Sequence, residues 1–73
     1  MSAPTEIRSP AVGTILEILV APGESVTEDQ ELLVIESMKV EIPVVAPRDG
    51  TIASIEVELE TQVAEDALLV TLA

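Results

Sequence analysis

The sequence predicts an all-β fold, a flattened barrel or sandwich of seven or eight short strands in two sheets. Three observations lead to this prediction. The second half of the chain repeats the first at a fixed offset, the large hydrophobic side chains are all aliphatic, and turns containing Pro or Gly separate the apolar segments. Branched aliphatic residues favour strands, and closely spaced turn signals are typical of sandwiches and barrels. Two copies are too few for a solenoid, so we expect a closed pair of halves.

The repeat has an offset of 37 residues and needs no gap. The identical pairs are Pro10/Pro47, Gly13/Gly50, Thr14/Thr51, Ile15/Ile52, Ile18/Ile55, Val20/Val57, Val26/Val63, Glu28/Glu65, Asp29/Asp66 and Leu32/Leu69. This similarity is far above chance for unrelated segments. We therefore expect both halves to adopt the same structure, related by a quasi-two-fold axis.

Each half is expected to supply one alternating strand and one strand that is apolar throughout. Segments 14–20 and 51–57 alternate, and 32–35 and 68–72 are short apolar runs typical of buried strands. The side chains expected on the buried face of the alternating strands are Leu16, Ile18 and Val20 in the first copy and Ala53, Ile55 and Val57 in the second.

Turn residues and one proline define the remaining elements. Segments 10–13, 21–24 and 47–50 combine Pro and Gly, which fix or free the backbone angle φ as turns require. Pro43 lies inside the apolar stretch 40–46 and cannot donate a ladder hydrogen bond, so its strand must lie at a sheet edge or carry a bulge.

A helix is the alternative for the middle of the chain. Ser25-x-x-Glu28 or Thr27-x-x-Gln30 could form a capping box that opens a helix extending to Lys39. Against this alternative, the apolar residues of 32–35 are continuous rather than spaced by three and four. Strands remain the prediction.

Composition excludes several classes of function. The 73 residues include 14 acidic and three basic side chains, a net charge of -11, and neither His nor Cys. A Ser-His-Asp triad, a Cys-His pair and a His/Cys zinc site are therefore impossible. Nucleic acid is a poor partner for so acidic a chain without aromatic residues. No apolar run is long enough for a membrane span or signal peptide, and we expect a soluble cytoplasmic protein without a metal site.

The segment between the two copies carries the candidate site. Strands on both sides of Met38-Lys39 would leave these two residues as the turn of a hairpin. Two-residue hairpins prefer type I′ turns with positive φ at both positions, normally Asn-Gly. A non-Gly residue held at positive φ costs about 1–3 kcal/mol. The hypothesis is that something outside the domain requires the Met and Lys side chains there.

Lys39 is the only lysine in the chain. A lysine amine is protonated at neutral pH, so an external enzyme would have to supply an activated acyl donor and a base. Two interpretations remain open from position alone: Lys39 is a site of covalent modification, or it is a charge that protects a hairpin tip. Met38 could likewise fold back over the sheet edge as a filler, or serve as a recognition contact.

The motifs around the lysine resemble those of the biotinyl domain, the biotin carboxyl carrier domain of the biotin/lipoyl attachment family. The resemblance rests on Val34-Ile-Glu-Ser-Met-Lys-Val-Glu-Ile and on Ala46-Pro-Arg-Asp-Gly-Thr-Ile, and it extends from about Ile7 to Leu72. It implies two four-stranded antiparallel sheets in a barrel-sandwich hybrid. It also implies a domain at residues 6–73 behind a short flexible tail at residues 1–5. The equal lengths of 20–26 and 57–63 leave no room for the protruding loop that some family members insert.

The resemblance further implies a function. A biotin protein ligase would attach biotin to Lys39, with Glu36, Ser37, Met38 and Val40 as the recognition hairpin. A biotin carboxylase would then carboxylate the biotin, and the carrier would deliver carboxybiotin to a carboxyltransferase, as in acyl-CoA carboxylases such as acetyl-CoA carboxylase. The chain itself would be a non-catalytic subunit. Val40 departs from the family pattern, which has a second Met there, and the change is expected to lower ligase efficiency.

Two alternatives stay open. The sister lipoyl domain of 2-oxoacid dehydrogenase systems shares the fold, the repeat and the lysine position, and would carry lipoate. It usually has Asp-Lys-Ala at the tip, so Ser37-Met38-Lys39-Val40 fits biotin better. A structural hairpin module that is never modified is the third interpretation.

Overall fold

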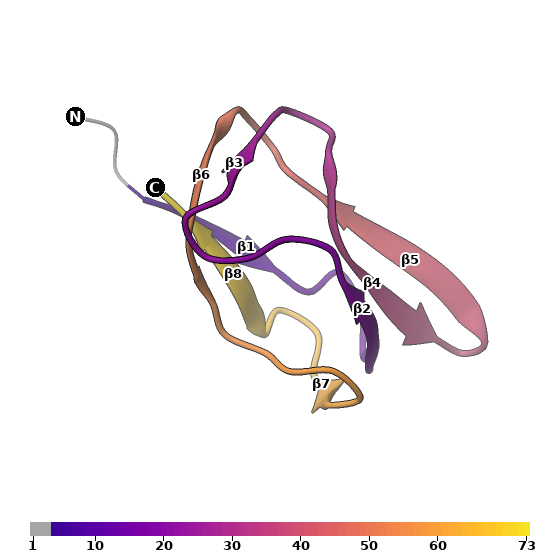
Figure 1. The fold of residues 1–73 in the computed structure, drawn as a ribbon. Helices are drawn as coiled ribbons and strands as arrows, with labels where there is room; N and C mark the ends of the chain where they lie inside the picture. Colours follow the sequence, from indigo (N-terminus) through magenta and orange to yellow (C-terminus); the bar gives the residue numbers. More distant parts are fainter. Residues whose placement is uncertain (1–3) are drawn as a thin grey trace.

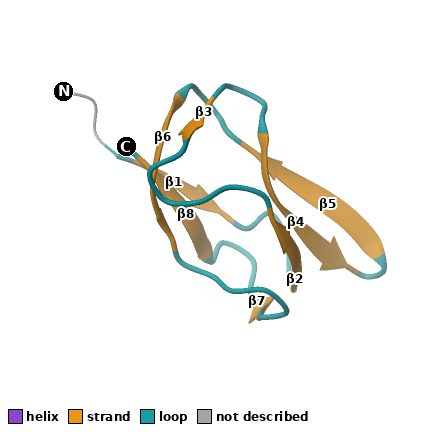
Figure 2. Cartoon of the chain, viewed as in Figure 1, coloured by secondary structure: helices purple, strands orange, loops and turns teal. Residues whose placement is uncertain are grey.

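The computed structural model describes residues 4–73, which form eight strands and no helix (Figures 1 and 2). The strands are β1 Thr5–Arg8, β2 Gly13–Ile18, β3 Ser25–Val26, β4 Glu31–Ser37, β5 Val40–Val45, β6 Gly50–Ile55, β7 Gln62–Val63 and β8 Leu68–Leu72. The predicted all-β class is confirmed, and the helical alternative for the segment up to Lys39 is wrong within this range.

The strands form two four-stranded sheets with equivalent orders. One sheet has the order β1-β8-β6-β3 and the other β5-β4-β2-β7, and every pairing is antiparallel. Adding 37 residues converts β2, β3 and β4 into β6, β7 and β8, and subtracting 37 converts β5 into β1. The two sheets are therefore copies of each other, as the repeat predicts.

The equivalence extends to single backbone hydrogen bonds. The amide of Leu19 donates to the carbonyl of Leu32 at 2.9 Å, and 37 residues later the amide of Glu56 donates to the carbonyl of Leu69 at 2.8 Å. Backbone bonds form wherever the chain path allows, whatever the side chains. The two copies thus follow the same path even where their sequences differ.

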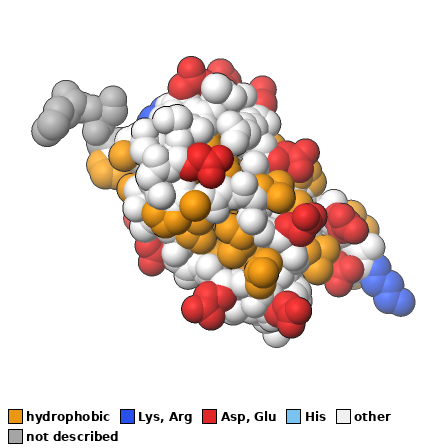
Figure 3. Space-filling model, in the orientation of Figure 1, with side chains coloured by type: hydrophobic (Ala, Val, Ile, Leu, Met, Phe, Trp, Pro, Cys, Tyr) orange, Lys and Arg blue, Asp and Glu red, His pale blue; other side chains and the backbone are white. Residues whose placement is uncertain are grey.

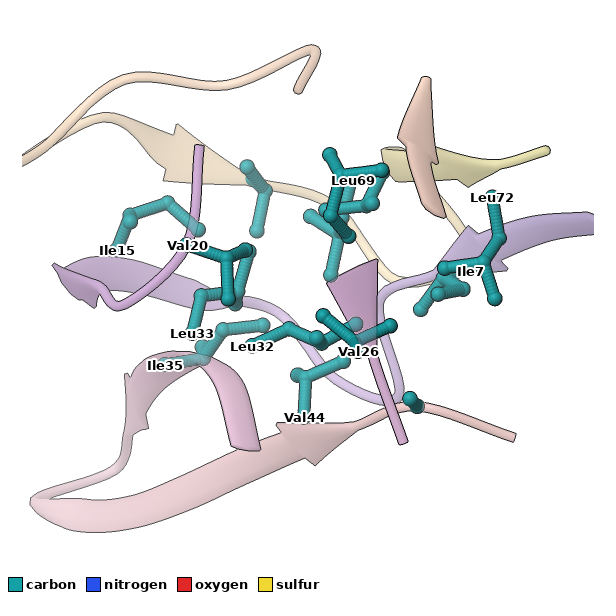
Figure 4. Close-up of a cluster of buried hydrophobic side chains, with 14 residues drawn as sticks. Ile7, Ile15, Val20, Val26, Leu32, Leu33, Ile35, Val44, Leu69 and Leu72 are labelled. Atoms are coloured by element: carbon teal, nitrogen blue, oxygen red, sulfur yellow. The ribbon is translucent and has the colours of Figure 1, made fainter. Parts of the chain in front are cut away.

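The core lies between the sheets and is built from equivalent aliphatic side chains (Figure 4). Among the fully buried side chains are two pairs that are equivalent under the repeat, Ile15 with Ile52 and Leu32 with Leu69. Figure 4 shows side chains from strands of both halves converging on one cluster. Burial of apolar surface of this kind is the main stabilising term in folding.

Two bulges correct the predicted buried face. The register of β2 against β4 shifts between Ile15 and Glu17, and that of β6 against β8 shifts between Ile52 and Ser54. An extra residue in one strand reverses the alternation beyond it. The deepest positions are therefore Ile15 and Ile52.

The residues predicted for that face are distributed differently. Only Val20 is buried, Leu16, Ile18, Ile55 and Val57 are half-buried, and Ala53 is exposed. Val20 belongs to the core cluster, and Ile18, Ile55 and Val57 pack against it. The predicted alternation therefore holds beyond the bulges and fails at Leu16 and Ala53.

Pro43 lies in β5, which is the edge strand of its sheet. Its missing N–H is tolerated there because the outer side of an edge strand has no ladder partner. The prediction from the proline is confirmed. The proposed capping residues Thr27 and Gln30 instead close a turn, in which the Thr27 amide donates to Oε1 of Gln30 at 3.1 Å.

The first strand begins at Thr5, which pairs with Leu72. Strand β1 therefore includes Thr5, the last residue of the predicted tail. Of the tail predicted for residues 1–5, residues 1–3 lie outside the described part of the chain.

Candidate attachment site on the β4–β5 hairpin

The hairpin between β4 and β5 ends in a two-residue turn. Ser37 and Val40 are paired across the strands, and Met38 and Lys39 connect them with φ values of 52° and 67°. Both residues occupy the left-handed region that a type I′ turn requires. The predicted turn, at the predicted position and with the predicted strain, is confirmed.

The other positive φ values among residues 4–73 occur in turns that the two halves share. The other residues with positive φ are equivalent under the repeat: Asp29 (71°) matches Asp66 (70°), and Gly23 (90°) matches Glu60 (65°). Those positions belong to turns that both copies of the fold need, and Asp is among the residues that tolerate this region. The positions equivalent to Met38 and Lys39 fall outside the described residues, so the repeat offers no comparison for them.

The turn presents its side chains to solvent. Met38 is 94% exposed and Val40 59% exposed, Lys39 and Glu36 are exposed, and Ser37 is half-buried. Met38 therefore does not fold back as a filler. Figure 3 shows a lysine or arginine side chain protruding from the end of this hairpin, on a surface with many acidic groups.

The Lys39 ammonium is not held by a carboxylate. The salt bridge found among residues 4–73 joins Arg8 to Glu6 at 2.6 Å, and that carboxylate raises the pKa of the Arg8 guanidinium. Glu36 and Glu41 face each other across the hairpin one step behind the tip, and both are exposed. The lysine side chain is thus exposed and outside the salt bridge of the described residues.

The base of the hairpin is fixed by a close approach of two strands. A Cβ on Gly13 would clash with the carbonyl oxygen of Glu36 and with the side chain of Ile35. Glycine lets β2 come this near to β4, and Ile35 is fully buried in the core just behind the tip. An exposed tip is therefore joined to a closely packed base.

A groove runs beside the hairpin, and sequence reasoning missed it. Its volume is about 510 Å³, and it is lined by the β1–β2 loop, the end of β4, Met38 and residues around β7. The signal that could have revealed it is a mismatch within the repeat, since Ala11 and Val12 stand where the second copy has Arg48 and Asp49.

Other chemistry finds little support in the described residues. Within residues 4–73 no group of three or more His, Cys, Asp or Glu side chains is arranged to hold a metal ion. In the same range no helix is long and apolar enough to cross a membrane. Glu28, Asp29, Glu65 and Asp66 lie in equivalent turns, as predicted for solvated turn residues.

Comparison with known proteins agrees with the fold. The family model Biotin_lipoyl, described as "Biotin-requiring enzyme", matches residues 5–72. The chain belongs to this biotinyl/lipoyl family. The biotin carboxyl carrier protein of Streptococcus mutans is 39% identical over 72 residues, which cover 99% of this chain and 55% of that protein. The mitochondrial propionyl-CoA carboxylase alpha chain of Homo sapiens is 39% identical over 66 residues, 90% of this chain and 9% of that one.

A solved lipoyl structure also matches the biotinyl/lipoyl domain described here. It is the lipoyl domain of the 2-oxoglutarate dehydrogenase complex from Azotobacter vinelandii, with a TM-score of 0.81 and 34% identity over 93% of this chain and 94% of that one.

The chain spans about half of the bacterial carrier protein and a small part of the human carboxylase subunit. Relatives of both the biotin and the lipoyl type share its fold.

Proposed function

We propose that this domain is a biotin carboxyl carrier, with biotin held in an amide bond to Lys39. The observation that carries the proposal is the strained turn: two non-glycine residues at positive φ present the chain's single lysine to solvent at the junction of two matching halves. A fold that needed only a turn there would gain stability from Asn-Gly. The side chains at the tip are kept for a purpose outside the fold.

Support for biotin over lipoate comes from the local sequence and from the relatives. The tip reads Ser37-Met38-Lys39-Val40, whereas the lipoyl pattern is Asp-Lys-Ala. Both 39%-identical relatives bear the names of a biotin carrier protein and an acyl-CoA carboxylase subunit. The fold does not discriminate between a biotin carrier and a lipoyl carrier, because a lipoyl domain superposes well on this chain.

The residues present fit an attached acyl arm. Nζ of Lys39 would attack the carboxyl carbon of an activated biotin donor held by a biotin protein ligase. An amide bond forms, the activating group leaves with its electron pair, and the ligase takes the proton from Nζ. Met38 and Val40, both exposed apolar side chains beside the amine, would give the ligase a surface on which to orient the tip.

Once attached, biotin would carry a carboxyl group from a biotin carboxylase to a carboxyltransferase. The domain's own contribution is mechanical, because tethering raises the effective concentration of the reactive group at each partner. The flexible lysine stem provides reach, and the packed base at Gly13 and Ile35 keeps the tip in one orientation. We place this function in a carboxylase of the acyl-CoA type, in the cytoplasm, with the chain as a non-catalytic component.

The test is reconstitution with purified ligases. The unmodified chain is incubated with a biotin protein ligase, biotin and ATP, or with a lipoate ligase, lipoate and ATP, and its intact mass is measured. We expect one biotin per chain, much slower lipoylation, and no product from Lys39→Arg, because a guanidinium is not acylated by this chemistry.

The biotinylated product is then offered to a biotin carboxylase with ATP and labelled bicarbonate. Label should appear on the carrier and be absent from the Lys39→Arg variant. Preferential lipoylation would assign the domain to the lipoyl branch, and a chain modified by neither ligase would be a structural module.

A further inference from the structure

The two ends of the molecule differ in one feature that the attachment chemistry does not require. Beside the hairpin lies the groove of about 510 Å³. We call it the hairpin groove and define it by Ala11, Val12, Gly13, Glu36 and Glu65, which are among its lining residues. The 37-residue repeat gives every one of these positions an equivalent at the opposite end, so the two places can be compared residue by residue.

At the opposite end an arginine of the chain itself occupies the equivalent place. Arg48, the equivalent of Ala11, donates through Nη1 to the carbonyl oxygens of Asp49 at 2.8 Å and Ala73 at 3.2 Å, and through Nε to Oγ1 of Thr5 at 3.1 Å. Its Nη1 lies 2.7 Å from the point where a Cβ on Gly50 would be. These acceptors thus form a binding position for a guanidinium group, which we call the seat.

The hairpin groove has the equivalent strands but lacks the arginine, and Ile42 stands where the Thr5 hydroxyl accepts from Nε of Arg48. Gly13 replaces Gly50 and lies against the carbonyl oxygen of Glu36, as Gly50 lies near that of Ala73. The side chain of Ala11 is too short to enter the seat. Val12, 56% exposed, has no carboxylate to match Asp49, whose Oδ1 accepts from the Glu28 amide at 2.8 Å.

The lining of the empty seat carries two acidic residues, Glu36 and Glu65, which suits a cation. Glu36 supplies a side-chain carboxylate where the second copy has Ala73. In the second copy, Nη2 of Arg48 is buried without a hydrogen-bond partner. Glu65 adds a second acidic group to the lining of the hairpin groove. The other arginine, Arg8, is already bound to the Glu6 carboxylate and to the Asp66 carbonyl oxygen at 3.0 Å.

We propose that the hairpin groove binds an arginine side chain of a protein that acts on Lys39, in the way that Arg48 occupies the equivalent place in the second half. The guanidinium would donate to the backbone carbonyls of Val12 and Glu36 and pair with the Glu36 carboxylate. Arginine is preferred to lysine because its planar fork satisfies several acceptors at once. The identity of the partner as a ligase or carboxylase rests on the proposed function, whereas the arginine site itself does not.

The site is tested on the unmodified full chain by NMR. The ¹⁵N-labelled chain is titrated with N-acetyl-arginine amide and, separately, with N-acetyl-lysine amide at the same ionic strength. We expect weak, saturable shifts of the amides of Gly13, Glu36 and Glu65 with the arginine compound and several-fold weaker ones with the lysine compound. No saturable shift, equal shifts with both compounds, or shifts spread over the acidic surface would each overturn the proposal.

Two variants give matched controls. Ala11→Arg transplants the arginine of the second half into the first and should abolish the response to the arginine compound while leaving Lys39 exposed. Arg48→Ala empties the opposite seat and should create a second set of shifts, at Gly50 and Ala73. Should Arg48→Ala fail to fold, Ala11→Arg still decides the matter, because an unchanged titration of that variant contradicts the proposed site.

A kinetic measurement identifies the partner. With a biotin protein ligase and with a biotin carboxylase, Ala11→Arg should raise KM for the carrier several-fold for at least one enzyme, with kcat unchanged. Unchanged kcat/KM with both enzymes would overturn the assignment to these partners. Failure of biotin attachment in the wild-type chain would refute the proposed function but leave the NMR result intact, so the two failures are distinguishable.

Discussion

The hairpin end and the terminal end of this domain are built from equivalent strands and have diverged in what they expose. At one end β4 and β5 are joined by Met38-Lys39, both at positive φ. At the other end the equivalent strands β8 and β1 pair through Leu72 and Thr5 without a connecting turn. Figure 1 shows the C-terminus on the opposite side of the molecule from the hairpin tip.

This difference separates the features that packing explains from those that it does not. Core positions, bulges and most strained turns occur in pairs under the 37-residue repeat, so packing and chain path account for them. The difference that can be compared directly is the open groove beside Ala11, whose equivalent place is filled by Arg48. The tip residues Met38 and Lys39 have no equivalent among the described residues. Because the two halves share one fold, a position at which they differ calls for a functional explanation.

The largest effect is expected from the tip lysine. Lys39→Arg keeps the charge and the exposed position, and it should remove biotin attachment completely while leaving the free energy of unfolding unchanged. Urea denaturation and intact mass after ligase treatment measure the two properties. A variant that loses stability would mean that the hairpin end has a structural task the terminal end lacks.

The next effect tests whether the halves are equivalent in energy. Ile15→Ala and Ile52→Ala each remove a fully buried side chain and should each cost about 2–5 kcal/mol through cavity formation. We expect the two losses in chemical denaturation to agree closely. Ala53→Gly, at an exposed position, is the matched control and should cost much less. Unequal losses for the two isoleucines would show that the two halves do not contribute equally to the free energy of unfolding.

A smaller gain in stability is expected from replacing the two residues at positive φ in the hairpin turn. Replacing Met38-Lys39 by Asn-Gly supplies the residues that a type I′ turn prefers and should stabilise the domain by about 1 kcal/mol. The same pair placed at Ser54-Ile55, within a strand, should destabilise it. No gain in the denaturation midpoint from the tip substitution would mean that the turn holds no strain, and the reason for its residues would have to lie elsewhere.

The smallest effect concerns the residue after the lysine. Val40→Met restores the family pattern at a position that is 59% exposed, so folding should not change. Because an unbranched Met side chain adapts to a partner surface, kcat/KM for biotin ligation should rise by about two- to fivefold, equivalent to less than about 1 kcal/mol. An unchanged or lower value would show that Val40 suits its own ligase.

Much of the fold followed from the repeat, the turn residues and Pro43, because these signals are local or compare the chain with itself. The turn at Met38-Lys39 was predictable because only two residues remained between two apolar strands. The bulges that bury Ile15 and Ile52 were not, since they depend on how β2 and β6 pair with other strands. The hairpin groove was missed for a similar reason: its walls come from residues 11–14, 36–38 and 62–65, which meet only in the folded chain.

The central claim is that the tip exists to carry biotin on one amine. The most direct measurement is peptide-mapped mass spectrometry of the protein purified from its native host, supported by streptavidin binding. We expect a biotinyl group on the peptide that contains Lys39 and none on the amino terminus. A lipoyl group at Lys39, or an unmodified lysine in protein isolated from cells with ample biotin, would contradict it.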